Sequence, residues 1–208
     1  PAIDAEVMIM LMDFFHALGL KGLKLQINSL GCCECRPAYR EILKKAIHSQ
    51  LSCLCENCNQ RYQKNPMRIL DCKVKSCQDI AVNLPKTTDN LCHECDVHFK
   101  GVQSLLDTTK VSYDLDFMLV RGLDYYTHTA FEVTSSQLGA QNAICGGGRY
   151  NTLVEEFEGP ATPCFGFALG LERLISIVPF SNSNDYEKKS DIYIIYLGLF
   201  TILILKRS

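Results

Sequence analysis

The distribution of cysteine limits this chain's fold more than any other sequence feature, because ten of its twelve cysteines fall between residues 32 and 95. The pairs Cys55-x-x-Cys58 and Cys92-x-x-Cys95 stand within that stretch. Such a turn lets two thiolates converge on one tetrahedral zinc ion, and a second pair completes the four ligands. The sequence therefore predicts a structural zinc site, with reduced cysteines that only pack in the interior as the alternative. The zinc ligands that we predict are Cys55, Cys58, Cys92 and Cys95.

The sequence leaves open which of the remaining cysteines take part in such a site. Cys72 and Cys77 form a further candidate pair between the two Cys-x-x-Cys turns, and His93 and His98 add possible imidazole ligands. We interpret the compressed run Cys32-Cys-x-Cys35 as a loop.

The overall composition is that of an ordinary folded domain, with 47% apolar residues, 21% charged residues and a net charge of −2 over 208 residues. It excludes a disordered tail and a collagen-like or coiled-coil chain, and it argues against a protein that coats nucleic acid generally. The apolar start carries Asp4, Glu6 and Asp13 and no basic residue precedes it, unlike a signal peptide. We therefore predict a cytoplasmic protein whose cysteines stay reduced.

Hydrophobic periodicity predicts a mixture of helices and strands. Residues 3–20 have the spacing of an amphipathic helix, and further helices are expected from Pro37, over 93–106 and over 171–178. The polar residues 181–190 lack periodicity and predict a linker. The predicted strands are Leu23–Asn28, Phe117–Val120, Thr129–Thr134, Ala143–Cys145, Phe165–Gly170 (as a buried strand) and Asp191–Tyr196.

One part of this near-neutral chain is basic. Between Glu34 and Lys75 there are nine Lys and Arg against four Asp and Glu, a local excess of +5. Such an excess suits a surface that contacts the phosphates of a nucleic acid.

Three later segments suit the binding of an anionic ligand. In Arg121-Gly-Leu-Asp-Tyr-Tyr-Thr127 the arginine offers a fixed fork of donors for a phosphate or carboxylate, although a surface turn with two packed tyrosines is the simpler interpretation. Gly146-Gly-Gly-Arg-Tyr150 lets a ligand approach the backbone closely, but it lacks the spacing of either nucleotide-binding glycine motif. In Gly166-Phe-Ala-Leu-Gly-Leu-Glu-Arg173 the small residues leave one strand face bare, which suits a flat ring or a neighbouring helix equally.

Taken together and in this order, the three segments resemble the histidyl-tRNA synthetase family. The first two resemble that family's histidine-recognition motifs, and the third resembles motif 3 of the class II synthetases. Upstream, Arg36-Pro-Ala-Tyr-Arg40 and Asn65-Pro-Met-Arg-Ile-Leu-Asp-Cys72 also fit the bacterial form. The resemblance covers about residues 1–197.

The resemblance implies a role for each residue that matches. Arg121 would be the catalytic arginine, near the α-phosphate of ATP and the histidine carboxylate, where it would stabilise the charge that develops during attack on phosphorus. Gly170 would lie under the adenine and Arg173 would contact the γ-phosphate of ATP, which is bound with Mg²⁺. The residues that would bind histidine are Arg121, Tyr125, Tyr126 and Tyr150.

The fold implied by the resemblance is α+β: part of the antiparallel sheet of a class II synthetase, with flanking helices and a mainly helical insertion domain. We expect residues 1–32 and 106–180 to belong to the catalytic core. Residues 33–105 would be the insertion, which reaches toward the acceptor stem of tRNA(His). Residues 191–208 would begin a truncated anticodon-binding domain.

The activity implied is that of an aminoacyl-tRNA ligase: ATP-dependent activation of histidine to histidyl-adenylate and transfer to tRNA(His), by a homodimer in the full-length family. Motifs 1 and 2 of the family would precede Pro1, so we expect an internal fragment that catalyses poorly because it lacks the motif 2 arginine. Two alternatives are a histidine-sensing regulatory subunit of ATP phosphoribosyltransferase and a zinc-dependent RNA-binding module made of the insertion.

Overall fold

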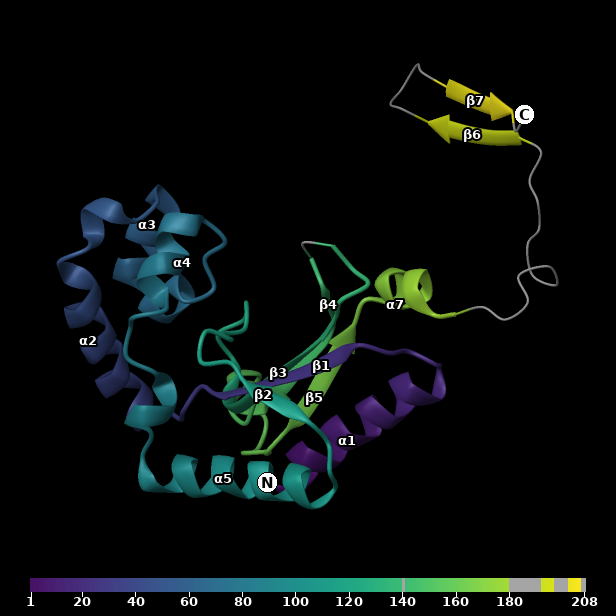
Figure 1. Ribbon diagram of the computed structural model, residues 1–208. Helices are drawn as coiled ribbons and strands as arrows, with labels where there is room; N and C mark the ends of the chain where they lie inside the picture. The colour runs from purple at the N-terminus through teal and green to yellow at the C-terminus, as the bar shows by residue number, and fades with distance from the viewer. Residues whose placement is uncertain (140, 180–191, 197–201, 207–208) are drawn as a thin grey trace. The chain divides into compact units, whose positions relative to one another are not determined.

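The computed structural model describes residues 1–139, 141–179, 192–196 and 202–206 (Figure 1). The chain divides into two units, Pro1–Val178 and Pro179–Ser208. The strands of the first unit are β1 (Leu23–Ser29), β2 (Tyr113–Leu115), β3 (Thr127–Ser135), β4 (Ala143–Arg149) and β5 (Phe165–Leu169). They form one sheet in the order β2-β1-β3-β4-β5, in which β1 and β2 are parallel and every other neighbouring pair is antiparallel. In the second unit, β6 (Ile192–Tyr196) and β7 (Ile202–Lys206) form an antiparallel pair.

Helices cover one face of the sheet and form a separate group beyond its edge (Figure 1). The helices are α1 (Ala2–Ala17), α2 (Cys35–His48), α3 (Glu56–Lys64), α4 (Lys75–Ala81), α5 (His93–Thr108), α6 (Leu153–Glu156) and α7 (Leu171–Ile177), with 3-10 turns η1 (Leu51–Cys53), η2 (Pro66–Ile69) and η3 (Thr87–Asn90). Helices α1 and α5 lie against the sheet, and α2, α3 and α4 make up the other group. None of the helices in the described ranges is long and apolar enough to cross a membrane.

The sheet has two different faces because side chains alternate along each strand. On one face, Ile27, Phe131 and Gly147 lie side by side in the strand register, and Leu25 pairs with Val133 in the next row. These apolar side chains are buried in one core with the inner stripes of α1 and α5. The opposite face carries small and polar residues, so it is left free for a ligand.

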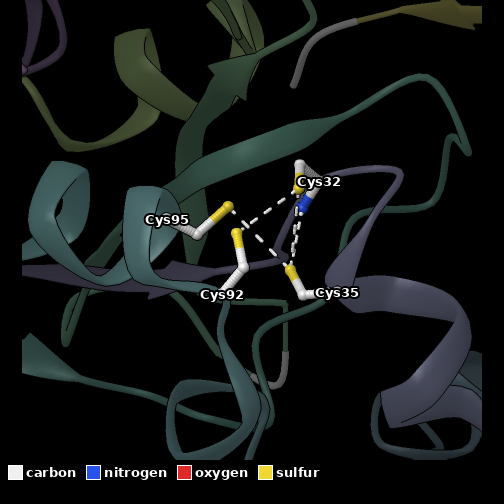
Figure 2. A group of neighbouring side chains, drawn as sticks. All are labelled: Cys32, Cys35, Cys92 and Cys95. Atoms are coloured by element: carbon white, nitrogen blue, oxygen red, sulfur yellow. Dashed lines mark hydrogen bonds between the residues drawn. The ribbon is translucent and has the colours of Figure 1, made fainter.

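The insertion leaves the core after β1 and returns to it through α5. Its apolar core, in which Tyr39, Leu43 and Ile47 are fully buried, continues into Tyr126 and Ala130 beside and on β3. At its base, the chain that leaves and the chain that returns meet at four cysteines (Figure 2). The insertion is therefore a small helical unit that is attached to the sheet both at this base and through a shared apolar core.

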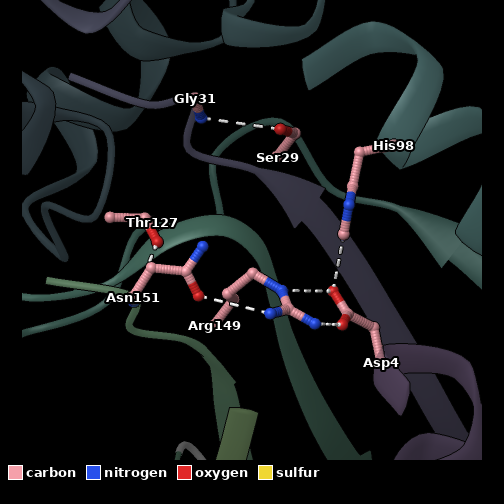
Figure 3. Close-up of polar contacts among 7 residues, drawn as sticks. All are labelled: Asp4, Ser29, Gly31, His98, Thr127, Arg149 and Asn151. Carbon is pink, nitrogen blue, oxygen red and sulfur yellow. Dashed lines mark hydrogen bonds and ion pairs between the residues drawn. The ribbon is translucent and has the colours of Figure 1, made fainter. Parts of the chain in front are cut away.

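A buried ion pair joins the first helix to the sheet (Figure 3). The carboxylate of Asp4 accepts hydrogen bonds from the guanidinium of Arg149 on β4 and from Nε2 of His98 on α5, the latter at 2.9 Å. Although burial alone raises the pKa of Asp4, the bonds from His98 and Arg149 outweigh burial and hold it well below its usual range. The buried carboxylate of Asp4 thus connects α1 to α5 and to β4, three elements that are far apart in the sequence.

The sequence predicted most of these elements. The α+β fold class, the helix at the N-terminus, and the strands at 23–28, 129–134, 143–145 and 192–196 are confirmed. The helix expected from Pro37 begins two residues earlier at Cys35, and β4 extends through the glycines to Arg149.

Three predictions about the strands were wrong or incomplete. Residues 117–120 form a turn, because the Asp116 carboxylate accepts from the Met118 amide at 2.9 Å and Asn28 holds the Leu119 carbonyl at 3.0 Å. The strand in that region is β2, which pairs in parallel, whereas an antiparallel sheet was expected. The strand at 165–169 is a half-exposed edge strand and was expected to be buried.

The C-terminal predictions have different outcomes. The linker predicted at 181–190 lies outside the described residues, and β7 was not predicted at all. That residues 191–208 begin an anticodon-binding domain stays a prediction.

Replacing Asp4 by Asn is expected to destabilise the first unit by about 3–5 kcal/mol, because it leaves the Arg149 guanidinium buried without its counter-charge. Glu6→Gln, an exposed change on the same helix, should shift stability by less than about 0.5 kcal/mol. Urea denaturation followed by circular dichroism measures both. Equal effects of the two substitutions would contradict the central role given to Asp4.

His128, beside this ion pair, makes stability depend on pH. Burial and the nearby charges of His98 and Arg149 lower its pKa to about 4, against about 6.5 in an unfolded chain. The unfolded chain therefore binds more protons in this window, and stability is lost as the pH falls from about 6.5 to 4, at up to about 1.4 kcal/mol per pH unit. His128→Asn, which tolerates the backbone φ of +50° there, should flatten the pH dependence of urea midpoints in this range. An unchanged slope would count against this assignment.

Candidate active site

The candidate site lies on the uncovered face of the sheet. Glu132, Gly146 and Ala168 stand side by side on β3, β4 and β5, so two of the three neighbours carry almost no side chain. A groove of about 390 Å³ runs over this row, and a cleft of about 870 Å³ adjoins it on the side of the insertion. Arg121, Glu132 and Arg173 line both hollows.

Arg121 reaches over the sheet from the segment that precedes β3. Its Nη1 donates to a carboxylate oxygen of Glu132 at 3.0 Å, and its guanidinium lies 5.7 Å from the ring centroid of Tyr126. A Cβ atom at Gly146 would collide with the guanidinium, so the first glycine of the triplet provides the space in which Arg121 lies. Burial raises the pKa of Glu132 and the adjacent Arg121 opposes this shift.

The three tyrosines predicted to bind histidine form one cluster. The ring centroids of Tyr125 and Tyr126 are 4.6 Å apart, and Tyr150 meets both rings edge-on at 5.9 and 6.2 Å. Alternation along a strand would place Tyr125 and Tyr126 on opposite faces, but residues 121–126 form turns and both rings point the same way. Burial, with the neighbouring Tyr125, raises the pKa of Tyr126 to about 12, so this phenol stays protonated.

Gly170 and Arg173 lie at the other end of the groove. Gly170 ends β5 and caps α7, and Arg173 stands on the first turn of that helix. The guanidinium of Arg173 donates to the Ala143 carbonyl and to the Gln141 side chain, both at 2.7 Å. These two hydrogen bonds hold the guanidinium of Arg173 beside the groove that Arg121 also lines.

The insertion holds the Arg121–Tyr126 segment in place through three polar contacts. Asn65 donates to the Asp124 carboxylate at 2.7 Å, and Arg68 donates to the Gly122 carbonyl at 2.7 Å. Arg36 donates to the carbonyl of Tyr126. The insertion therefore forms one wall of the cleft and also fixes the backbone that carries the arginine and the tyrosines.

The four cysteines predicted to share one zinc ion are not brought together. Cys55 and Cys58 lie with Cys72 and Cys77, whereas Cys92 and Cys95 lie with Cys32 and Cys35. The predicted set combined one half of each group, because proximity in the sequence does not report which turns the fold brings together. Cys32 and Cys35, which had been interpreted as a loop, belong to a cysteine cluster.

Sequence reasoning also missed the contacts that organise the site. Glu132 was given no role, although it follows closely after the segment that begins at Arg121 and pairs with that arginine. Nothing in the sequence indicated the three hydrogen bonds from the insertion to residues 122–126. Their donors Arg36, Asn65 and Arg68 only stood within motifs that resemble the family. The Cys32-x-x-Cys35 spacing did carry a signal, since it is the same spacing as in the other two pairs.

Comparison with solved structures defines the class of protein. The chain is similar to the crystal structure of apo S. aureus histidyl-tRNA synthetase, with a TM-score of 0.67 and 39% identity over 85% of this chain and 43% of that one. The fold is that of a class II aminoacyl-tRNA synthetase.

Sequence comparison defines the family. The family model described as histidyl-tRNA synthetase matches residues 1–174, and the chain belongs to that family. Relatives include the histidine–tRNA ligase of Desulforamulus reducens, 58% identical over 84% of this chain, and that of Natranaerobius thermophilus, 50% identical over 95%. The chain spans about half the length of these curated relatives, 42% and 48% respectively.

Replacing Arg68 by Ala is expected to loosen the segment that carries Arg121, because the Gly122 carbonyl loses a charged hydrogen-bond donor. Amide hydrogen exchange of residues 122–127 should accelerate roughly fivefold, as expected for the loss of about 1 kcal/mol of local stability. Lys64→Ala, an exposed change on the same stretch of the insertion, serves as the control. Exchange that is unchanged in Arg68→Ala would show that this hydrogen bond does not hold the segment.

Proposed function

We propose that this chain forms part of the catalytic unit of a histidine–tRNA ligase, which activates histidine with ATP and transfers it to tRNA(His). The observation that carries the proposal is the position of Arg121, whose guanidinium lies on a bare strip of sheet between Glu132 and Gly146. Arg121 and Arg173 both line the groove, and Gly146, Ala168 and Gly170 leave room there for a ligand.

The geometry supports the first step of that reaction. Attack of a carboxylate on the α-phosphate of ATP joins two anions and builds negative charge in the transition state, which a fixed guanidinium stabilises. Arg121 offers this fork of donors, and Glu132 together with the Tyr126 ring holds it in place before the ligand binds. ATP is the substrate, with Mg²⁺ as its counter-ion.

Other parts of the site fit the two substrates. The flat strip at Ala168 and Gly170 suits the adenine ring, and Arg173 suits the terminal phosphate. The cluster of Tyr125, Tyr126 and Tyr150 suits the side chain of the amino acid, since its aromatic rings and hydroxyl groups match an imidazole.

The insertion is proposed to contact the acceptor stem of tRNA(His). Its excess of positive charge between residues 34 and 75 supports this role, and Lys45, Lys64, Lys73 and Lys75 are exposed. Homodimerisation and a place in the cytoplasm, where cysteines stay reduced, are proposed from the resemblance and from the free thiols of this chain.

The alternative of a regulatory subunit of ATP phosphoribosyltransferase is not favoured. The curated relatives that are 46–58% identical are named histidine–tRNA ligase. A regulatory subunit gains nothing from an adenylate moiety, so the two functions predict different ligand preferences.

Binding of a stable histidyl-adenylate analogue tests the proposal. By calorimetry, the histidyl sulfamoyl-adenosine should bind more tightly than histidine alone and more tightly than the seryl analogue. Arg121→Lys should weaken it roughly 10- to 100-fold, because the charge stays but the fork of donors is lost. Gly146→Ala should act similarly by displacing the guanidinium.

Two conservative variants serve as controls for that experiment. Lys45→Arg keeps the charge of an exposed cation on α2, and Gly139→Ala places a Cβ where nothing lies within 4 Å. Both should bind the analogue as the unmodified chain does. Equal affinity for the histidyl and seryl analogues, or no loss in Arg121→Lys, would refute the proposed site.

A further inference from the structure

We propose that this chain holds two structural zinc ions, each bound by four cysteines, at positions that differ from the single site expected from the sequence. One site lies at the base of the insertion and the other inside it, and we call them the base site and the inner site. The base site consists of Cys32, Cys35, Cys92 and Cys95, and the inner site of Cys55, Cys58, Cys72 and Cys77.

The base site has the dimensions of a tetrahedral zinc centre. In Figure 2 the four side chains converge on a common point from two Cys-x-x-Cys turns that are 60 residues apart. The Sγ–Sγ distances are 3.8 Å for Cys32–Cys35, 3.7 Å for Cys32–Cys92 and 3.9 Å for Cys35–Cys95. Zinc–sulfur bonds of about 2.3 Å at tetrahedral angles place sulfurs roughly 3.8 Å apart, which matches these three distances.

The inner site repeats this arrangement within the insertion. Its four sulfurs lie within 4.8 Å of one another, and Cys55 and Cys72 are 3.9 Å apart. Cys58 and Cys77 are fully buried in the apolar core of the insertion. Two independent groups with the same composition and size are difficult to explain as the chance packing of reduced thiols.

The backbone around both sites favours thiolates, which are the form that binds zinc. In the base site, the amides of Cys32 and Glu34 donate to the sulfurs of Cys35 and Cys32 at 3.2 and 3.4 Å. In the inner site, the amide of Cys55 donates to the Cys77 sulfur at 3.3 Å.

Helix starts add to the same effect. Cys55 and Cys92 are the N-cap residues of α3 and α5, where the positive end of the helix dipole lies. The Cys-x-x-Cys turn therefore serves both as a zinc-binding element and as the beginning of a helix.

A zinc ion at the base site would clamp the insertion to the core. Cys32 and Cys35 stand at the junction of β1 and α2, and Cys92 and Cys95 stand at the beginning of α5. The ion therefore closes a loop of about 60 residues. Loop closure of this length removes much of the conformational freedom of the unfolded insertion. The orientation of the insertion over the cleft is then set by the metal as well as by the three hydrogen bonds from the insertion to residues 122–126.

A zinc ion at the inner site would hold the segment that forms the wall of the cleft. Cys72 itself lines the cleft beside Asp71 and Lys73, a few residues after Asn65 and Arg68. Those two residues bond the segment that carries Arg121. The inner site thus connects metal binding to the position of Arg121 through fewer than ten residues of chain.

Metal content of the full 208-residue chain tests the proposal and does not depend on any catalytic activity. The chain purified from a zinc-supplemented culture should carry two zinc ions by inductively coupled plasma mass spectrometry. Cys32→Ser with Cys92→Ser should lower the content to one, and Cys55→Ser with Cys72→Ser should do the same. Combining all four substitutions should lower it to zero.

The matched control is Cys33→Ser with Cys53→Ser, because both cysteines are exposed and stand beside cluster residues without belonging to either group. This double variant should keep two zinc ions. One ion or none in the unmodified chain, or loss of an ion in the control, would overturn the two-site assignment.

A measurement on the unmodified chain keeps the proposal testable if a variant does not fold. Alkylation followed by peptide mass spectrometry should label Cys33 and Cys53 at once. The half-exposed cluster cysteines Cys32, Cys55 and Cys92 should react only after zinc is removed by a chelator. Labelling of these three without a chelator, or their recovery as disulfides, would refute the assignment.

Discussion

The rest of the structure depends on one constraint: the two faces of a single sheet must serve opposite purposes. One face packs Ile27, Phe131 and their neighbours against α1 and α5, which excludes water. The other must stay almost free of side chains where a ligand lies. Gly147 shows how tight the compromise is, because a Cβ atom there would meet the Phe131 ring and the Gly166 carbonyl on the next strand. Glycine is therefore needed on both faces of β4. Gly146 leaves room for Arg121 on one face, and Gly147 avoids a clash with its neighbours on the other.

The bare face works as a site only because other elements bring functional groups over it. Arg121 comes from a segment of turns that has no ladder of backbone hydrogen bonds to hold it. Its geometry is supplied by side chains of the insertion, through Asn65, Arg68 and Arg36. The insertion thus supports the candidate site in addition to its proposed contact with RNA, and a change in its position is expected to reach Arg121 directly.

Local sequence patterns predicted what local physics determines. The existence of α1 and the alternation of β1 and β3 were predicted correctly, because periodicity fixes them. The buried face of α1 was predicted only in part, because Leu11 and Phe15 are buried but Met10 and Phe14 are exposed. Contacts between distant segments were not found. The sequence shows three Cys-x-x-Cys turns but not which of them meet, and the pairing of Cys32 and Cys35 with Cys92 and Cys95 depends on how α5 returns to the sheet. The Asp4–Arg149 pair, separated by 145 residues, is of the same kind.

The proposed pairing of the cysteines around zinc also changes the net charge of the insertion. Between residues 32 and 95, ten Lys and Arg stand against seven Asp and Glu, a formal net charge of +3. Each zinc ion with four thiolates carries −2, so two such sites would bring the segment to −1. A surface that attracts phosphate must then depend on where the cations lie. Arg36 is close enough to Cys32 and Cys35 to respond to their charge, and it already bonds the carbonyls of Leu30 and Tyr126. Arg36 therefore belongs to the support of the site. The proposed contact with an RNA backbone falls to the exposed lysines of α2 and α3, to Lys73 and to Lys75 at the start of α4.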